Sequence, residues 1–406
     1  MTAPSQNHPQ RNSQRQRGAA MIIMMLIVML GLIALFTLRM DRKGPELDAD
    51  RKTALALAQA KEALIGYAAQ DANRPGSFPC PDINDDGLSK PLVDYPCSQV
   101  VARLPWQELG LPDLRDGAGE RLWYAISPKF ASNNSSALNS TTLGQITIRD
   151  SNGTVIYDAS ASPSTGVIAV IIAPGQVITR QGAAAPQDRS CSGGNGCDSN
   201  LVCKSPYQSV SKCAPQNYLD ILVGSEDNSD FVSPPPASPQ NGFILGTIRD
   251  ASGRTIVNDR ILLITANDLF SVVKKRIFGE IKGTNTTGLL GYYHDHSTFP
   301  WAATSPTGGA TPTTGGGLQA ANTLVGYAPI ADMSFPTRCD SAASCVDQGK
   351  MIDDKGWNTS NFYEVAPAFA PGGTQTCTLS ATCLTVNGIP NAKVRIRIDG
   401  TDFGIW

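Results

Sequence analysis

The chain has 406 residues, a formal net charge of −2 at pH 7 and 17% charged residues. The near-neutral charge excludes the strongly basic surface that general nucleic-acid binding requires. The length predicts two globular units at about 100–200 residues per domain. The low charged fraction, with abundant Ser, Thr, Asn, Gly and Pro, indicates a loop-rich surface.

The N-terminus combines a polar, basic leader with an apolar segment. Residues 1–18 contain Arg11, Arg15 and Arg17 and no acidic residue, and residues 19–38 form an apolar stretch. At about 1.5 Å per residue, a helix of this length crosses a hydrocarbon core of about 30 Å. Because basic flanks stay on the cytoplasmic side, we predict a single-pass inner-membrane protein with a periplasmic head.

Two other interpretations of this segment are a cleaved secretory signal and a plain signal anchor. A secretory signal has an apolar core of about 7–15 residues followed by a small-residue cleavage site. Here the core is longer and ends in Thr37-Leu38-Arg39-Met40-Asp41. A plain anchor fits the length and the flanking charges equally well.

A second helix is predicted after the Gly44-Pro45 break. Residues 50–69 are rich in Ala and Leu, and apolar residues recur on one side of a helix at the positions Leu57, Ala60, Leu64, Tyr67 and Ala68. This pattern predicts an amphipathic helix that continues the membrane helix, with Pro45 imposing at most a kink.

Four short motifs follow one another in the first part of the chain. Gly18 separates the basic leader from the apolar helix. Residues 63–67 read Ala-Leu-Ile-Gly-Tyr and residues 76–79 read Gly-Ser-Phe-Pro. In residues 114–124 an Asp and a Gly precede a strand with aromatic residues. In this order the motifs resemble those of type IV pilins and type II secretion pseudopilins.

The resemblance implies how the chain is processed and assembled. A prepilin peptidase would cleave between Gly18 and Ala19, and the apolar helix would then pack with those of other pilins or pseudopilins in a filament. Ala19 replaces the usual aromatic first residue, and Ile23 stands where most of the family has Glu. The second departure is shared by tip-type minor pseudopilins.

The implied function is therefore that of a large minor pilin or pseudopilin, at or near the filament tip. The chain would be extracellular when incorporated in a pilus. Its head would bind a surface, a secreted protein or a partner pilin. The alternative is a membrane-anchored envelope enzyme or binding protein with an uncleaved signal anchor.

The ten cysteines form five pairs whose members lie close together in the sequence. Pairs that are close in sequence have the smallest loop-closure cost, and disulfides persist outside the cytoplasm. We therefore predict five local disulfides. Free thiols and zinc ligation are the alternatives, although zinc favours pairs separated by about 2–4 residues. The predicted pairs are Cys80 with Cys97, Cys191 with Cys197, Cys203 with Cys213, Cys339 with Cys345, and Cys377 with Cys383.

The first cysteine pair encloses the opening half of an EF-hand-like calcium loop. Asp82, Asn84 and Asp86 place side-chain oxygens at alternate positions before Gly87, and Leu88 would offer its carbonyl. The closing Glu of such a loop is missing, so another carboxylate would have to complete the shell. The alternative is an Asx turn that satisfies its own backbone.

The second half begins beyond a compositional break. Residues 181–215 are rich in Gly, Ser, Asn and Cys, and Pro234, Pro235 and Pro236 mark a linker. Later patterns predict strands at residues 243–248, 261–264 and 393–399 and a helix from Asn267, its candidate N-cap, to about Ile281.

The second half also echoes the first. Residues 289–293, followed by Ser297-Thr298-Phe299-Pro300, parallel residues 64–68, followed by Ser77-Phe78-Pro79. The parallel predicts a duplicated helix-to-loop unit, and a coincidence of common turn residues is the alternative.

Catalysis finds little support in the sequence. His294 and His296 would share one face of an extended segment, but no nucleophile elbow, zinc-protease helix, phosphate loop or dinucleotide fingerprint is present. We therefore predict a structural protein and not an enzyme.

The predicted fold class is α+β. A long N-terminal membrane-spanning helix precedes a pilin-like antiparallel-sheet head and a second α+β unit. Disulfides cross-link the chain. The predicted segments are a leader (1–18), the two helices (19–75), the head (76–180), a Cys-rich insertion with its linker (181–240) and the second unit (241–406).

Overall fold

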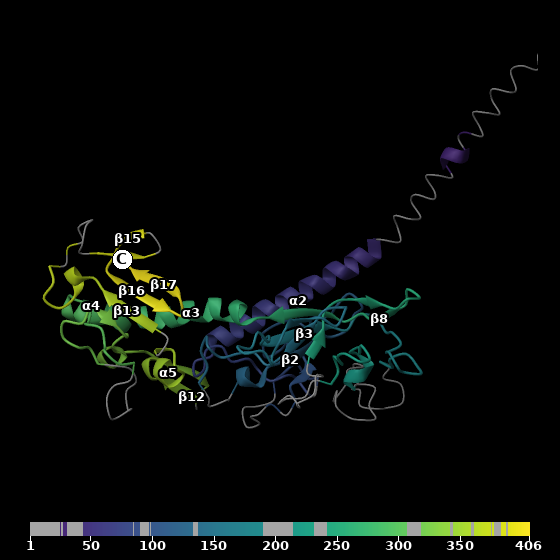
Figure 1. Cartoon of the computed structure of the whole chain (residues 1–406), viewed down its shortest axis with the longest axis horizontal. Coiled ribbons are helices and arrows are strands. Elements are labelled where there is room, and N and C mark those ends of the chain that lie inside the picture. Colours follow the sequence, from purple (N-terminus) through teal and green to yellow (C-terminus); the bar gives the residue numbers. More distant parts are fainter. Residues whose placement is uncertain are drawn as a thin grey trace, which may run out of the picture.

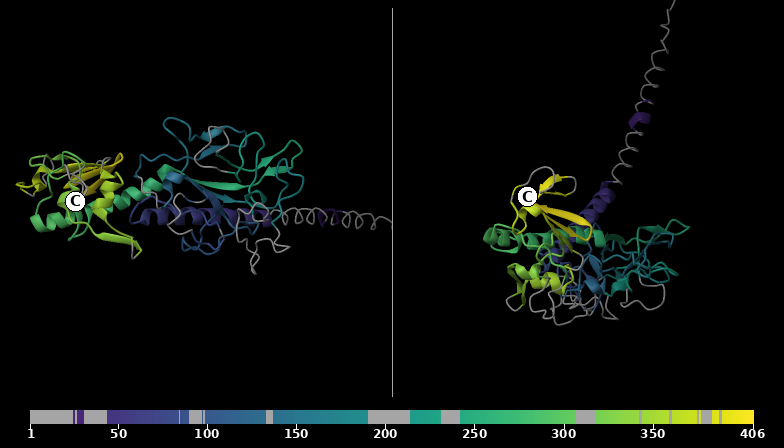
Figure 2. Two further views of the ribbon diagram at one scale, coloured as in Figure 1. Left: turned by 90° about the horizontal axis from the view of Figure 1, so that it is seen from below. Right: turned by 60° about the vertical axis from the view of Figure 1, so that its left-hand side comes forward.

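The computed structural model describes residues 25, 27–30, 44–83, 85–89, 97, 99–132, 137–189, 214–230, 242–306, 318–341, 344–358, 361–374, 376, 383–386 and 389–406. The described residues form a mixed α/β fold with several small sheets. The two largest sheets lie toward opposite ends of an elongated body (Figure 1). Two helices, α2 (Gly44–Gln70) and α3 (Ala266–Lys282), run along this body (Figure 2).

The first sheet has four antiparallel strands in the order β1-β2-β5-β9. Its central strands β2 and β5 are buried along their whole length. Continuous apolar runs such as Ala-Val-Ile-Ile-Ala in β5 are typical of strands covered on both faces. The strands are β1 (Val101–Arg103), β2 (Trp123–Ile126), β5 (Ala169–Ala173) and β9 (Arg260–Ile264).

Helix α2 covers one face of this sheet. Its sequence is rich in Ala and Leu, which favour helix formation. Ala60, Leu64 and Ala68 recur every fourth residue and are 0% exposed where the helix meets β5 and β9. The opposite side of the helix faces solvent, with Leu47 65% and Leu55 55% exposed.

Helix α3 begins with a capping box two residues earlier than the sequence indicated. Thr265, and not Asn267, is the N-cap: its hydroxyl accepts the N–H of Asp268 (3.2 Å), whose carboxylate accepts the N–H of Thr265 (2.9 Å). Asn267 lies inside the first turn, so its side chain cannot serve as the cap. Lys61 of α2 forms an ion pair with Asp268 (3.0 Å), which ties the two helices together.

The second sheet has four antiparallel strands in the order β10-β13-β16-β17. The alternating residues predicted to form a strand do so in β16, where Val394, Ile396 and Ile398 are buried. The strands are β10 (Val325–Gly326), β13 (Asn361–Val365), β16 (Val394–Ile398) and β17 (Thr401–Ile405). Helix α3 contacts β16 and is joined by α4 (Gly288–His296) and α5 (Gln348–Asp354).

The second sheet repeats the connections of the first. In each sheet the four strands lie side by side in chain order and every neighbour is antiparallel. The second strand of each sheet continues into a short 3-10 turn with the sequence Pro-x-Phe, and these turns are η1 (Pro128–Phe130) and η5 (Pro367–Phe369).

The two Phe-Pro pairs of the parallel motifs, at residues 78–79 and 299–300, occupy equivalent places in this repeat. The carbonyl of Phe130 accepts the N–H of Phe78, and the carbonyl of Phe369 accepts that of Phe299, each at 2.8 Å. Both Phe78 and Phe299 are buried. The sequence parallel is therefore matched by a structural one. The units differ in that residues 64–68 lie within α2 itself, whereas residues 289–293 lie in the separate helix α4.

Smaller sheets and turns complete the fold. Strand β6 pairs in parallel with β3, in a sheet of order β4-β3-β6, and three two-stranded hairpins are β7-β8, β11-β12 and β14-β15. The bounds are β3 (Thr147–Arg149), β4 (Val155–Tyr157), η2 (Pro215–Asn217), β6 (Gly242–Ile244), β7 (Ile248–Arg249), β8 (Thr255–Val257), η3 (Ile330–Asp332), β11 (Thr337–Ser341), β12 (Ser344–Asp347), β14 (Leu384–Val386) and β15 (Ile389–Ala392). Strands β6 and β9, which lie beyond residue 241, pair with β3 and β5 respectively.

The predicted membrane-spanning architecture is corrected by the structure. Of the predicted span 19–38, residues 25 and 27–30 are described, and Gly18 and Ala19 lie outside the described residues. Across the described ranges, no helix combines the length and the apolar character needed to cross a bilayer. Helix α2, with 27 residues, is long enough but carries charged residues throughout. This finding contradicts both the predicted fold class, with its long membrane-spanning helix, and the predicted single-pass inner-membrane localisation.

Candidate functional site

The predicted calcium loop lies next to a disulfide. Cys80 and Cys97 are joined, with their Cα atoms 5.6 Å apart, and Cys339 and Cys345 are joined across the β11-β12 hairpin. Cys383 is disulfide-bonded. The remaining predicted partners lie outside the described residues, and they are Cys191, Cys197, Cys203, Cys213 and Cys377.

Asp82 is fully buried and holds the loop that follows it. Its carboxylate accepts the N–H groups of Asp85 (2.8 Å) and Gly87 (2.6 Å), and Asp86 accepts the N–H of Leu88 (2.9 Å). These are the bonds of an Asx turn that satisfies its own backbone. Asn84, the remaining predicted ligand, lies outside the described residues.

Gly87 is required where the loop approaches the segment that follows β1. Its φ of 85° lies in the left-handed region, and a Cβ there would stand 2.7 Å from the Trp106 ring. The glycine that the calcium pattern assigned to a sharp turn therefore also makes room for an aromatic ring.

An acidic residue outside the predicted ligand set, Asp85, joins the loop to two arginines. Its carboxylate lies 3.0 Å from Arg121 and 3.8 Å from Arg103. Burial raises the pKa of Asp85, although both arginines act to lower it. Asp113 also binds Arg121 (2.8 Å). Burial acts to raise the pKa of Asp113, but hydrogen bonds from Arg121 and Arg115 bring it below its usual range.

Calcium binding by this loop stays a prediction. Within the ranges that the structure describes, no three or more His, Cys, Asp or Glu side chains gather closely enough to hold a metal ion. Asp82 would have to exchange its backbone hydrogen bonds for the ion. Leu88, whose carbonyl was the fourth predicted ligand, has a side chain that is 41% exposed.

Arg103, which lies beside the loop residue Asp85, is buried between two aromatic rings. Its guanidinium lies 4.3 Å from the centre of the Trp123 ring and 4.1 Å from that of Tyr218, and the residue is 3% exposed. Cation–π contacts of this kind are strongest when desolvated. The contacts of Arg103 therefore hold the segment around Tyr218 against the first sheet. The sequence carried no sign of these contacts, since Arg103 and Tyr218 are distant in the chain.

A second acidic cluster joins two distant segments. Asp220 and Asp259 are both 0% exposed. The N–H of Asp220 donates to the carboxylate of Asp259 (2.7 Å), and the N–H of Asp259 donates to that of Asp220 (3.2 Å). Neither residue stood out in the sequence, because each follows a short apolar run as ordinary turn material would.

The two histidines do not form a site. Their segment is the helix α4 and not an extended strand. His294 contacts Asp295 (3.0 Å), whereas the His296 ring stacks on Tyr292 with ring centres 4.1 Å apart. Residues two apart on a helix do not face one another.

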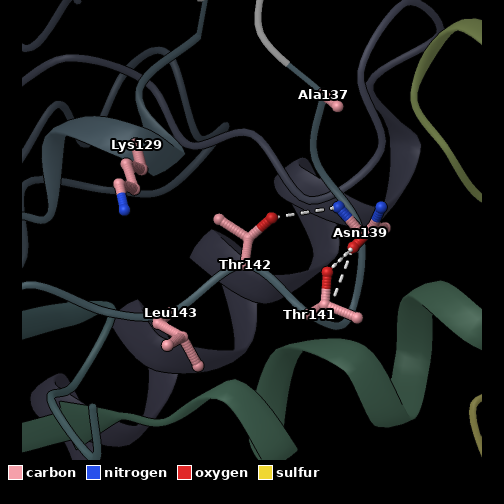
Figure 3. Close-up of a pocket in the computed structure, with 6 residues that line it drawn as sticks. All are labelled: Lys129, Ala137, Asn139, Thr141, Thr142 and Leu143. Carbon is pink, nitrogen blue, oxygen red and sulfur yellow. Dashed lines mark hydrogen bonds between the residues drawn. The ribbon is translucent and has the colours of Figure 1, made fainter. Parts of the chain in front are cut away.

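A cavity of about 430 Å³ with both polar and apolar lining residues opens beside η1 (Figure 3). Asn139 accepts hydrogen bonds from the Thr141 hydroxyl (2.6 Å) and N–H (2.9 Å), and its own N–H donates to Thr142 (3.2 Å). Its side-chain amide reaches the carbonyl of Lys355 (3.3 Å). These groups form hydrogen bonds with one another and with the segment around Lys355, so the cavity points to no particular ligand. It is lined by Lys129, Ala137, Asn139, Thr141, Thr142 and Leu143.

No protein-family model, curated protein or solved structure matches the chain.

Proposed function

We propose that this chain is a minor pilin-like or pseudopilin-like structural subunit that works by assembly at or near the tip of a filament. Its processing partner would be a prepilin peptidase that cleaves between Gly18 and Ala19. Its structural partners would be other pilins or pseudopilins. A surface or a secreted protein would be the ligand of the outward-facing loops.

The observation that carries the proposal is the contrast between the buried and the exposed side of α2. One side is buried on the antiparallel first sheet through Ala60, Leu64 and Ala68. The other side leaves Leu47 and Leu55 largely exposed. Exposed leucines among the charged residues of this side offer contact points for helices of other subunits. The place of α2 in the chain, after the processing motif and the apolar stretch 19–38, matches the order of the family that the sequence resembles.

The tip position is supported by an asymmetry between helices and sheets. The repeat gives the chain two four-stranded sheets. The helix of the second unit, α3, follows directly on β9 of the first sheet, so it has no free N-terminal extension. A bulky body with one assembly helix suits a low-copy subunit better than one repeated along the shaft. The absence of Glu at Ile23 points the same way.

Sheared filaments test the proposal directly. We expect quantitative mass spectrometry to find the chain at a few copies per filament with Ala19 as its N-terminal residue, and immunogold labelling to mark one end. A chain that retains Met1, or that is missing from purified filaments, would refute the proposal. Labelling along the whole shaft would refute the tip position alone.

Photo-crosslinking tests the role of α2. A crosslinking amino acid at position 55 should capture another pilin in assembled filaments. The same amino acid in place of Val272, which is 38% exposed on α3, is the matched control and should capture none. Equal capture at both positions would show that α2 is not the assembly surface.

A further inference from the structure

Asp220 and Asp259 meet where three segments converge. Asp220 belongs to residues 214–230, Asp259 to the connection between β8 and β9, and Gln187 approaches from residues 176–189. Gln187 donates its side-chain amide to Asp220 (3.0 Å) and is 6% exposed. The two carboxyl groups thus hold together segments that are distant in the sequence.

The hydrogen bonds distinguish the two aspartates. Asp220 accepts the Gln187 amide on one oxygen and the N–H groups of Asn258 (2.7 Å) and Asp259 (3.2 Å) on the other. Asp259 accepts the N–H of Asp220 (2.7 Å) and the Asn228 side chain (2.9 Å) on Oδ2, but its buried Oδ1 has no partner among the residues that the structure describes. An ionised carboxylate with one oxygen buried and unpaired is costly, so Asp259 is the group that retains a proton.

The nearby arginines do not neutralise the pair. Arg180 and Arg189 lower the pKa of Asp220, but Arg180 is already paired with Asp227 and Arg189 lies 3.6 Å from Glu120. Burial prevails and raises the pKa of Asp220 to about 6. Burial, and then the charge of Asp220, raise the pKa of Asp259 well above its ordinary value.

We propose that Asp220 and Asp259 form a pH-sensitive latch, closed while the pair retains a proton, that fastens residues 214–230 to the β8–β9 connection. When the pH rises and both groups ionise, two buried negative charges repel one another and the reciprocal backbone bonds loosen. The latch depends on the folded chain alone and acts whatever the chain assembles with.

The sign of the effect follows from linkage. Both groups bind protons more tightly in the folded chain, so they stabilise it most below the unfolded pKa of about 4. That stability is lost as the pH rises through about 6 for Asp220, and through a higher pH for Asp259. Each proton retained only by the folded state raises the unfolding equilibrium constant about tenfold per pH unit.

Unfolding of the whole chain by urea at pH 5 to 8.5 tests the latch. Relative to Asp259→Asn, the unmodified chain should show an unfolding constant that rises about tenfold per pH unit above pH 6. Asp250→Asn is the matched control: hydrogen bonds from Ser252 and Arg254 hold the pKa of Asp250 below its usual range. The Asp250→Asn variant should change the unfolding constant by the same factor at every pH, so that its pH dependence equals that of the unmodified chain. Parallel slopes for all three chains would overturn the proposal.

Hydrogen–deuterium exchange of the unmodified chain gives a readout that does not depend on a variant folding. After correction for the intrinsic rate, peptides covering residues 214–230 and 256–260 should exchange faster at pH 8 than at pH 5.5. Residues 169–173 should not change. Equal protection of these peptides at pH 5.5 and pH 8 would overturn the latch. So would a loss of the pH effect when calcium is added at pH 8, because the pair would then be a cation site.

Discussion

At the scale of residues, one turn occurs three times with different burial. In each case an Asp side chain accepts the N–H groups two and four residues later, and the Arg before it donates to the carbonyl of a glycine with positive φ. The Asp residues are Asp116, Asp150 and Asp250. The same geometry therefore closes the β3-β4 and β7-β8 hairpins and precedes β2.

Burial should decide how much each of these turns contributes to stability. Asp116 is 0% exposed, and its second oxygen also accepts the N–H of Gly175 (2.8 Å). We expect Asp116→Ala to lower the free energy of unfolding by about 3 kcal/mol, because three part-buried N–H donors lose an acceptor that is itself fully buried. Asp250→Ala, in an exposed turn, should cost markedly less, because water can replace the lost acceptor. Urea titrations measure both, and equal costs would show that burial of the first turn is unimportant.

At the scale of elements, the C-terminus of α2 is capped from the second half of the chain. Arg276 of α3 donates to the carbonyls of Ala69 (2.8 Å) and Asp71, and Gln348 of α5 donates to that of Ala72 (3.1 Å). Carbonyls at a helix end need such partners, because no later turn supplies them. The two halves are thus joined by polar contacts as well as by the core.

Removal of this cap should be costly. We expect Arg276→Ala to lower the free energy of unfolding by about 2 kcal/mol, since it leaves part-buried carbonyls unsatisfied. Lys275→Ala, one residue earlier on the exposed side of α3, is the matched control and should change it by no more than about 0.5 kcal/mol. Chemical denaturation compares the two, and indistinguishable variants would argue against the cap.

Local patterns in the sequence predicted several elements, and distant contacts explain what they missed. The periodic residues of α2 and the alternation of β16 each lie within one element, so their patterns were visible in the sequence. The pairing of β5 with β9 and the meeting of Asp220 with Asp259 join segments far apart in the chain, and no local pattern marks them. The predicted N-cap was wrong because the choice between Thr265 and Asn267 depends on where β9 ends.

At the scale of the whole molecule, the larger of two apolar cores extends through both units. It includes Ala56 of α2 and Ile405 of β17, and α3 contributes to it along most of its length. Phe270 of α3 joins the two units directly. Its ring lies 6.2 Å from that of Phe130, beside the first sheet, and 5.9 Å from that of Trp357, which follows α5.

This shared core predicts cooperative unfolding. We expect the chain to unfold in one calorimetric transition, because neither sheet can lose its packing without exposing side chains of the other. Phe270→Ala should lower the free energy of unfolding by about 3–5 kcal/mol, the usual cost of truncating a buried phenylalanine. Because it removes the contact that couples the units, it should also split the transition in two. Phe403→Ala, which loses a stack on Phe278 (4.7 Å) within the second unit, should destabilise the chain without splitting it. Two transitions in the unmodified chain would mean that the repeated sheets are independent domains joined by α3.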